Sequence, residues 1–152
     1  MSLLTELINN IADEELREQY QERVEIVQHK IKFMDRVPVA CLDAMNRPVV
    51  ELNNLLEAAG GDVKEDPLQA RVLIYYAKEL GMIQMMGTVA GLLAPTWPSV
   101  EYNNVYIWEE LPVAAFNGAA AVDALEDLVE MLYPGYFVFG NEGQTWVSFK
   151  TQ

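Results

Sequence analysis

One stretch, residues 105–137, constrains the fold more than any other, because it contains a strand, a loop and a helix in succession. Residues 105–108 (VYIW) are a short apolar run rich in β-branched and aromatic residues, which is typical of a buried strand. From Ala121 to Leu132 the apolar residues recur at three- and four-residue spacing, which predicts an amphipathic helix ending before Pro134-Gly135. We therefore expect an open α/β sheet, in which binding sites lie where strands end.

Two further apolar runs precede this unit and complete the expected sheet. Residues 36–43 and 71–76 are predicted strands, and residues 48–59 between them are a predicted helix with Pro48 in its first turn. A strand, a helix and a second strand in this order predict parallel strands joined by a right-handed crossover. Residues 82–94, which contain three methionines, are predicted to be a helix that is buried on most sides or forms an association surface.

The two ends of the chain add helices and a hairpin to this plan. Residues 3–11 predict a short helix, and an apolar stripe from Leu16 to Met34 predicts a long one with Asp13 as its N-cap. Residues 137–149 predict a β-hairpin around Gly140 to Gly143. The expected fold is a three-layer α/β domain with a short, mostly parallel sheet, a long N-terminal helix and a C-terminal β-hairpin. We expect an N-terminal helical segment at residues 1–35 and the α/β domain at residues 36–152.

The charge of the chain excludes several classes of partner. With 23 acidic and 10 basic residues, the formal charge is −13, and such a chain is repelled by nucleic acids and anionic membranes. No apolar run approaches the roughly 20 residues of a membrane span. No signal-peptide pattern follows Met1, so we expect a cytoplasmic protein, or a periplasmic one if a leader precedes this sequence.

Motifs for covalent or metal chemistry are missing from the sequence. It has no glycine-rich phosphate motif, no serine elbow and no metal-ligand spacing, and Cys41 and His29 are the only residues of their types. Glu109 and Glu110 form a weak candidate acid–base pair, since neighbouring side chains tend to diverge. We therefore expect no enzyme activity, no catalytic residue, no bound cofactor and no metal site.

The loops after the three predicted parallel strands offer the candidate contact surface, because such loops share one edge of a sheet. Their aromatic, amide and charged groups suit the binding of a large, partly polar molecule. The candidate ligand-binding residues are Asp43, Met45, Asn46, Arg47, Trp108, Glu109, Glu110, Phe116 and Asn117. Purely structural roles are the alternative: Asp43 and Asn46 as caps, Trp108 in the core, and the two glutamates in solvent.

The order of motifs over about residues 13–140 resembles a known family. The segments are RVPVACLDAMNRPVVELNNLLEAAGGD, EDPLQARVLIYYA, WPSVEYNNVYIW and FNGAAAVDALEDLVEMLYPGYF. In this order they resemble the C-terminal lobe and connecting helix of the helical-backbone substrate-binding proteins of ABC importers, which serve cobalamin, haem and ferric siderophores. The cobalamin-binding type is the most similar.

The resemblance implies a non-catalytic binding lobe whose ligand is cobalamin or a ferric chelate, with an ABC permease and an N-terminal lobe as possible partners. The family's N-terminal lobe has no counterpart before the long helix. Residues 62–70 replace a longer family segment that docks on the permease, and residues 118–121 replace an Arg-Pro-Gly-Pro run. A homodimeric interaction module without ligand is the alternative, in which a second copy covers apolar surface that a second lobe would bury.

Overall fold

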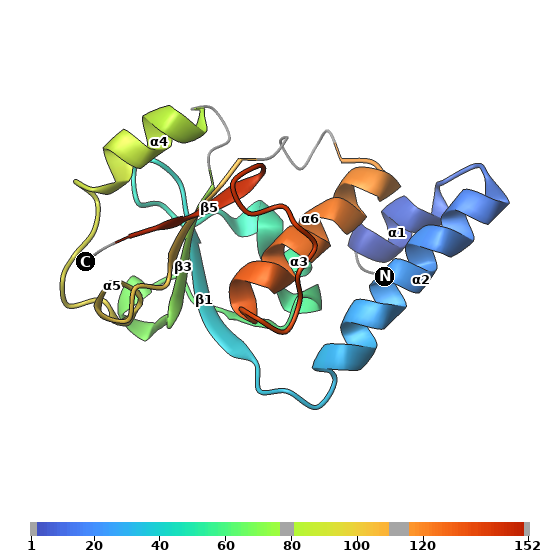
Figure 1. Ribbon diagram of the computed structural model, residues 1–152, viewed down its shortest axis with the longest axis horizontal. Coiled ribbons are helices and arrows are strands. Elements are labelled where there is room, and N and C mark those ends of the chain that lie inside the picture. The colour runs from blue at the N-terminus through green and yellow to red at the C-terminus, as the bar shows by residue number, and fades with distance from the viewer. Residues whose placement is uncertain (1–2, 77–80, 110–115, 151–152) are drawn as a thin grey trace.

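The computed structural model describes residues 3–76, 81–109 and 116–150, which form one α/β domain (Figure 1). The helices are α1 (Leu3–Asn9), α2 (Glu14–Ile31), α3 (Asn53–Ala58), α4 (Met82–Val89), α5 (Pro98–Glu101) and α6 (Gly118–Leu132), with the 3₁₀ turns η1 (Val50–Leu52) and η2 (Pro67–Gln69). The strands are β1 (Val37–Leu42), β2 (Gly61–Val63), β3 (Val72–Tyr76), β4 (Val105–Trp108) and β5 (Trp146–Phe149).

The five strands form one sheet in the order β2-β1-β3-β4-β5. The first four are parallel, with Ala40 opposite Leu73 and Ile74 opposite Tyr106, and β5 joins β4 in the antiparallel direction. All residues of β3 and β4 are buried, as expected for parallel strands covered on both faces. The predicted α/β class with a mostly parallel sheet is confirmed.

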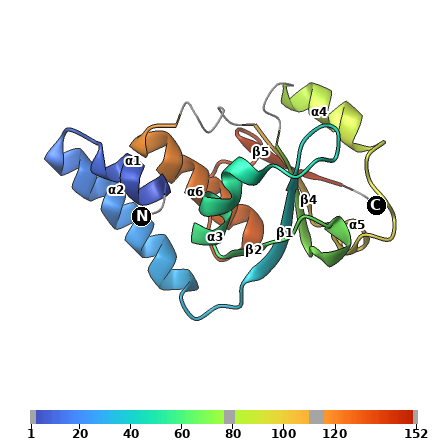
Figure 2. The same cartoon turned by 180° about the vertical axis from the view of Figure 1, so that it is seen from behind.

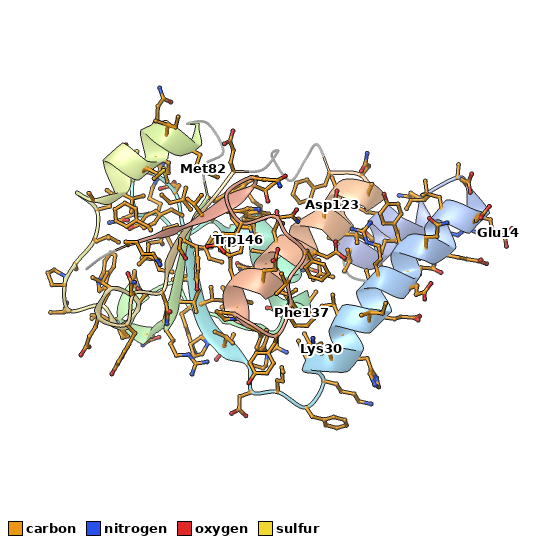
Figure 3. All side chains as sticks on the ribbon, in the orientation of Figure 1. Glu14, Lys30, Met82, Asp123, Phe137 and Trp146 are labelled. Atoms are coloured by element: carbon orange, nitrogen blue, oxygen red, sulfur yellow. The ribbon has the colours of Figure 1, made fainter. Side chains whose placement is uncertain are left out.

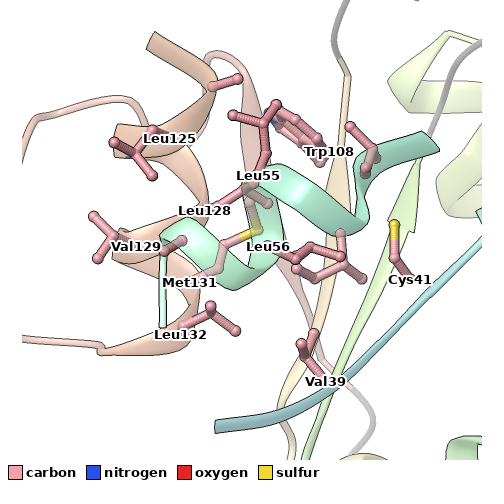
Figure 4. Close-up of a cluster of buried hydrophobic side chains, with 14 of the residues drawn as sticks. Val39, Cys41, Leu55, Leu56, Trp108, Leu125, Leu128, Val129, Met131 and Leu132 are labelled. Atoms are coloured by element: carbon pink, nitrogen blue, oxygen red, sulfur yellow. The ribbon is translucent and has the colours of Figure 1, made fainter. Parts of the chain in front are cut away.

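Helices cover both faces of this sheet and so make three layers (Figures 1 and 2). Side chains alternate along β1, so Val39 and Cys41 point to one face and Ala40 and Leu42 to the other. The first face packs on α1, α2, α3 and α6, and Figure 4 shows its core from β1 to Leu125 on α6. The second face packs on the α4–α5 segment.

Helix α6 lies at the centre of the larger layer, in contact with α1, α2 and α3. Twelve of its 15 residues are buried, so it is covered on nearly every side. Its first residue, Gly118, lets α1 approach closely, because a Cβ there would stand 2.5 Å from Cδ1 of Ile11 and 2.9 Å from the carbonyl oxygen of Leu7. The predicted amphipathic helix is confirmed, but its buried residues include acids as well as apolar side chains.

Several boundaries differ from those predicted, for local reasons. Asp13 is the N-cap of α2, as predicted, and accepts a hydrogen bond of 3.0 Å from the backbone N–H of Leu16. The helix predicted from Pro48 begins later, because Pro48 pairs with Leu42 in an antiparallel bridge and η1 follows. The helix predicted for residues 82–94 ends at Val89. The short strand β2 was not predicted.

The C-terminal segment forms its antiparallel pair with a different partner from the one expected. β5 pairs with β4, and residues 137–139 contain no strand. Instead the rings of Phe137 and Phe139 stack at 6.0 Å between centroids, and Nζ of Lys30 on α2 lies 4.6 Å from the centroid of Phe137 (Figure 3). The Lys30 ammonium also donates to the carbonyl of Tyr136. These contacts hold the segment against the helical layer rather than in a hairpin.

Candidate functional site

The loop after β1 is a closed five-residue turn, residues 43–47, which we call the β1 turn. Oδ1 of Asp43 accepts hydrogen bonds from the backbone N–H groups of Met45 (2.8 Å) and Arg47 (2.9 Å), and Oδ2 lies 3.1 Å from Nε of Arg47. Partial burial raises the pKa of Asp43, but these N–H groups and the Arg47 charge outweigh it, so the pKa lies below its usual value. Asp43 is therefore a carboxylate at neutral pH.

Asn46 fastens the β1 turn to the body of the protein. Its φ of 60° places it in the left-handed region, which asparagine tolerates better than most residues. The Tyr75 hydroxyl donates to its Oδ1 at 2.7 Å, and its Nδ2 donates to the carbonyl of Leu92 at 2.9 Å. Burial raises the pKa of Tyr75, so the phenol remains a donor. The amide of Asn46 therefore hydrogen-bonds to the protein itself, which agrees with the alternative of a purely structural role. It anchors a turn, however, and does not cap a helix.

Two side chains of the β1 turn, Met45 and Arg47, face solvent. Met45 is 69% exposed, and so is the side chain of Arg47. Because Asp43 and Asn46 fix the backbone between them, these two exposed side chains project from a rigid support at the carboxyl end of β1. We call the ends of the parallel strands on this side of the sheet the carboxyl edge.

The predicted contact residues at the end of β4 differ in their exposure to solvent. Trp108 is fully buried; its Nε1 donates to Oδ2 of Asp127 at 3.1 Å, and its ring centroid lies 5.3 Å from that of Tyr76. Its ring therefore offers no surface to a ligand. The prediction that Trp108 belongs to the contact surface was wrong. Glu109 is exposed, and its backbone N–H donates to the carbonyl of Thr145 at 2.8 Å. Glu110 lies outside the described residues.

The two candidate residues before α6 also differ in exposure. Phe116 is only 6% exposed and belongs to the larger core, so it too offers little contact surface. Asn117 is exposed and is the N-cap of α6, accepting a hydrogen bond of 2.8 Å from the backbone N–H of Ala120. Among the described candidates, the exposed side chains are those of Met45, Arg47, Glu109 and Asn117. β3 lies between β1 and β4, so Leu42 and Trp108 are two strand spacings apart, roughly 10 Å.

A cavity of about 480 Å³ lies between α2, α6 and the segment that leads to β5. Arg23 of α2 reaches across it, with Nη2 2.9 Å from Asp123 and Nε 3.2 Å from Glu126, both on α6. The hydrogen bond with Glu126 is the main cause that raises the pKa of Arg23. Other residues at the cavity are Asp127, Phe139 and Asn141. The strongest charges at this cavity pair with each other, and these ion pairs join α2 to α6.

Asp127 and Glu130, one turn apart on α6, hold the sheet and the C-terminal segment. Asp127 is 1% exposed and accepts from Trp108 and from Nδ2 of Asn141, the latter at 2.9 Å. Burial raises its pKa, although these hydrogen bonds oppose the rise. Glu130 accepts from the backbone N–H of Phe139 at 3.0 Å and lies 3.5 Å from Nε1 of Trp146. These roles were not predicted from the sequence, although carboxylates at three- and four-residue spacing in an otherwise apolar helix were a usable signal.

The described residues show neither a metal centre nor a membrane helix. Within residues 3–76, 81–109 and 116–150, no three His, Cys, Asp or Glu side chains are grouped so as to hold a metal ion. Over the same residues, no helix has the length and apolar character needed to cross a membrane.

Several solved structures have a fold similar to that of this chain. No protein-family model and no curated protein matches the chain. The chain is similar to Helicobacter pylori CeuE in a Ni-His complex, with a TM-score of 0.64 and 14% identity over 88% of this chain and 52% of CeuE. It is also similar to an ABC-type Fe³⁺-hydroxamate transport protein of Saccharomonospora viridis (TM-score 0.57, 16% identity, 78% of this chain and 48% of that one).

A third similar structure is an ABC transporter substrate-binding protein of Listeria monocytogenes, with a TM-score of 0.58 and 16% identity over 86% of this chain and 63% of that one. These likenesses show that the chain shares its fold with one part of such a substrate-binding protein. The chain spans about half to just under two thirds of the length of these three structures.

Proposed function

We propose that this chain is a non-catalytic ligand-binding lobe whose ligand is a metal chelate of the cobalamin or ferric-siderophore kind. The main support is the β1 turn, which presents Met45 and Arg47 outward from the carboxyl edge. The fold of the chain is shared with a protein solved in a Ni-His complex and with an Fe³⁺-hydroxamate transport protein. In open α/β sheets, ligands bind beside this edge. The proposed contact surface consists of Met45, Arg47, Glu109 and Asn117, with Glu110 as a further candidate.

The geometry of the β1 turn favours binding for two physical reasons. The hydrogen bonds of Asp43 and Asn46 fix its backbone before any ligand arrives, so little conformational entropy is lost on binding. Its two exposed side chains are complementary, because the thioether of Met45 adapts to an irregular apolar surface and the guanidinium of Arg47 donates hydrogen bonds. One lobe covers only one side of a ligand, so we expect an affinity in the micromolar range, roughly −8 kcal/mol.

The partners follow from the same proposal. A second lobe, supplied by another chain or by a longer form of this one, would cover the other side of the ligand. An ABC permease would receive it, and the compartment would be the periplasm. The similar proteins whose names mention Ni-His and Fe³⁺-hydroxamate define the ligands to be tried first.

Isothermal titration calorimetry tests the proposal with four probes: cobalamin, haem, a ferric trihydroxamate and Ni²⁺-histidine. We expect heat of binding with at least one of them. The variant Arg47→Ala should weaken that binding by about fivefold to tenfold, since a solvent-exposed contact contributes roughly 1 kcal/mol. Arg71→Ala is the matched control, because Arg71 is also exposed but lies just before β3, at the opposite edge. Absence of heat with all four probes would refute the proposal.

A homodimeric interaction module is the second candidate function, favoured by the outer face of α4. Ile83 is 86% exposed, on the side of α4 that points away from the buried Met85 and Val89, and Met86, 42% exposed, lies at the margin of this side. Light scattering at micromolar concentration should show a dimer that Ile83→Glu dissociates. Val138→Glu is the control, because Val138 is equally exposed (83%) but lies in the C-terminal segment. A monomeric wild-type chain would exclude this candidate.

A further inference from the structure

The β1 turn is closed by hydrogen bonds between its own residues. The backbone N–H of Asp43 donates to the carbonyl of Arg47 at 2.9 Å, and the N–H of Asn46 donates to the carbonyl of Asp43 at 3.1 Å. The carboxylate of Asp43 accepts the backbone N–H groups of Met45 and Arg47. Asp43 therefore determines the shape of the turn, whereas the placement of the turn on the protein depends on contacts with other elements.

Two hydrogen bonds of the Asn46 side chain join the β1 turn to other elements. Nδ2 donates to the carbonyl of Leu92, just after α4, and Oδ1 accepts from the hydroxyl of Tyr75, on β3. A carbonyl oxygen can only accept, so the contact with Leu92 fixes which end of the amide is the nitrogen, and the Tyr75 hydroxyl must then be the donor. Because Met45 and Arg47 adjoin Asn46 in the chain, these two bonds hold both exposed side chains.

Tyr75 lies where a rigid support for the turn is needed. It is opposite Leu42, the last residue of β1, so its ring lies beside the strand from which the turn emerges. Its side chain is fully buried in the second core, against which Ala44 of the turn also packs. Burial raises the pKa of the hydroxyl, which therefore remains a donor near neutral pH.

Position 46 makes three demands that asparagine meets together. The φ of 60° requires a residue that tolerates the left-handed region, Tyr75 requires an acceptor, and the carbonyl of Leu92 requires a donor. Glycine would tolerate the backbone but offer neither group. Aspartate would accept from Tyr75 but place an oxygen against the carbonyl of Leu92. The residue at this position is therefore specified by the two contacts that place the turn.

We propose that Tyr75 is a positioning residue for ligand binding, which acts through Asn46 to set where the β1 turn holds Met45 and Arg47. The inference rests on the proposed function, because it concerns the same surface, and it assigns a role in binding to a buried hydroxyl that no ligand can touch. Removal of the hydroxyl should leave the turn folded but let it move as a unit. A ligand would then have to order Met45 and Arg47, and the lost conformational entropy would weaken binding.

NMR relaxation of the ligand-free protein tests the placement. In Tyr75→Phe we expect the order parameters of the backbone N–H groups of Met45 and Arg47 to fall from about 0.85 to about 0.7, toward the values of flexible segments. Amide exchange of these two groups should stay within about twofold of wild type, since Asp43 still accepts both. Tyr106→Phe is the matched control, because it removes the same hydroxyl from the neighbouring strand, on the other face of the sheet.

Calorimetry measures the effect on binding, with whichever of cobalamin, haem, the ferric trihydroxamate and Ni²⁺-histidine binds. Tyr75→Phe should weaken affinity by about fivefold in the wild-type chain, as expected for one hydrogen bond, but by no more than about twofold when Arg47→Ala is already present. The effects are not additive because Tyr75 acts largely through Arg47. Asn46→Gly keeps the left-handed backbone and removes both hydrogen bonds, so it should weaken affinity at least as much, and Tyr75→Phe should add nothing to it.

The outcomes separate this inference from the proposed function. If none of the four probes binds the wild-type chain, the proposed function fails and this inference fails with it. If a probe binds but the order parameters of the turn do not change in Tyr75→Phe, or fall equally in Tyr106→Phe, only this inference is refuted. Equal losses of affinity with and without Arg47→Ala would also refute it, because Tyr75 would then affect binding without the side chain that it positions.

Discussion

The substitution Trp108→Phe distinguishes a core role for this residue from a role in ligand contact. The sequence pattern placed Trp108 on the contact surface, whereas the structure buries its ring fully against Tyr76 and directs its Nε1 to Asp127. If Trp108 has this buried role, the phenylalanine variant loses stability and keeps its affinity for a chelate. If Trp108 stacks on the ligand, the affinity falls instead.

The expected loss of stability has two parts. Removal of the indole N–H leaves Oδ2 of the buried Asp127 without this donor, and a hydrogen bond to a charged group contributes about 1.5–3 kcal/mol. The smaller phenyl ring gives up roughly 40 Å² of buried apolar surface, which costs about 1 kcal/mol. The total, about 3 kcal/mol, is a large fraction of the 5–15 kcal/mol that stabilises a typical domain.

Urea unfolding followed by circular dichroism measures the free energy of unfolding of wild type and variant, and calorimetry of the same samples measures the affinity. Trp97→Phe is the matched control, because Trp97 is only partly buried, on the other face of the sheet, and should cost less than about 1 kcal/mol. A loss below about 1 kcal/mol for Trp108→Phe, or a fall in affinity of more than about threefold, would contradict the buried role.

Two further predictions concern α6. Gly118→Ala should cost about 1–3 kcal/mol in urea unfolding, because its Cβ would clash with Ile11, whereas Gly87→Ala on α4, with no neighbouring atom within 4 Å, should gain up to about 1 kcal/mol; equal effects would contradict the packing. Burial raises the pKa of Asp127 above the unfolded value of about 4, so the folded state favours the protonated form. Wild type should therefore lose stability relative to Asp127→Asn as pH rises from about 4 to the raised pKa, and a constant difference would contradict this.

The parts of the fold that depend on local patterns were predictable from the sequence. β1, β3 and β4 are apolar runs of four to six residues, and a parallel sheet buries such strands on both faces. The N-cap Asp13 and the apolar stripe of α6 were likewise readable, because a cap and a helical period involve residues close together in the chain.

The elements that were missed depend on residues far away in the chain. β2 has only three residues and exists because Gly61 to Val63 pair with β1, which a local pattern does not reveal. The late start of α3 follows from the bridge between Pro48 and Leu42, since a proline suited to a first helical turn was used in a tight loop instead. The segment 137–139 (FVF) consists of residues that favour strands, but Phe137 stacks on Phe139 and lies against Lys30 of α2, while β5 pairs with β4.

For the candidate site, the sequence predicted which loops follow the carboxyl ends of β1 and β4, but not which of their residues are exposed. Asp43, Asn46 and Trp108 were chosen because their side chains can bind a ligand, and the same groups can bind the protein itself. In the structure Asp43 binds the β1 turn, Asn46 binds Tyr75 and the carbonyl of Leu92, and Trp108 binds Asp127. Residue type does not distinguish these uses, because the internal partners come from other elements.

The internal contacts also determine how rigidly the exposed groups are held. Glu109 follows the buried Trp108 directly, and its backbone N–H bonds to Thr145, in the segment that Asn141 fastens to Asp127. The end of β4 is therefore held by α6 on one side and by the C-terminal segment on the other. Because residues that cannot touch a ligand hold this end of the sheet, their substitution should change stability first and affinity only afterwards. Substitution of Arg47 or Glu109 should do the reverse, and this opposite order is how binding and supporting residues can be told apart.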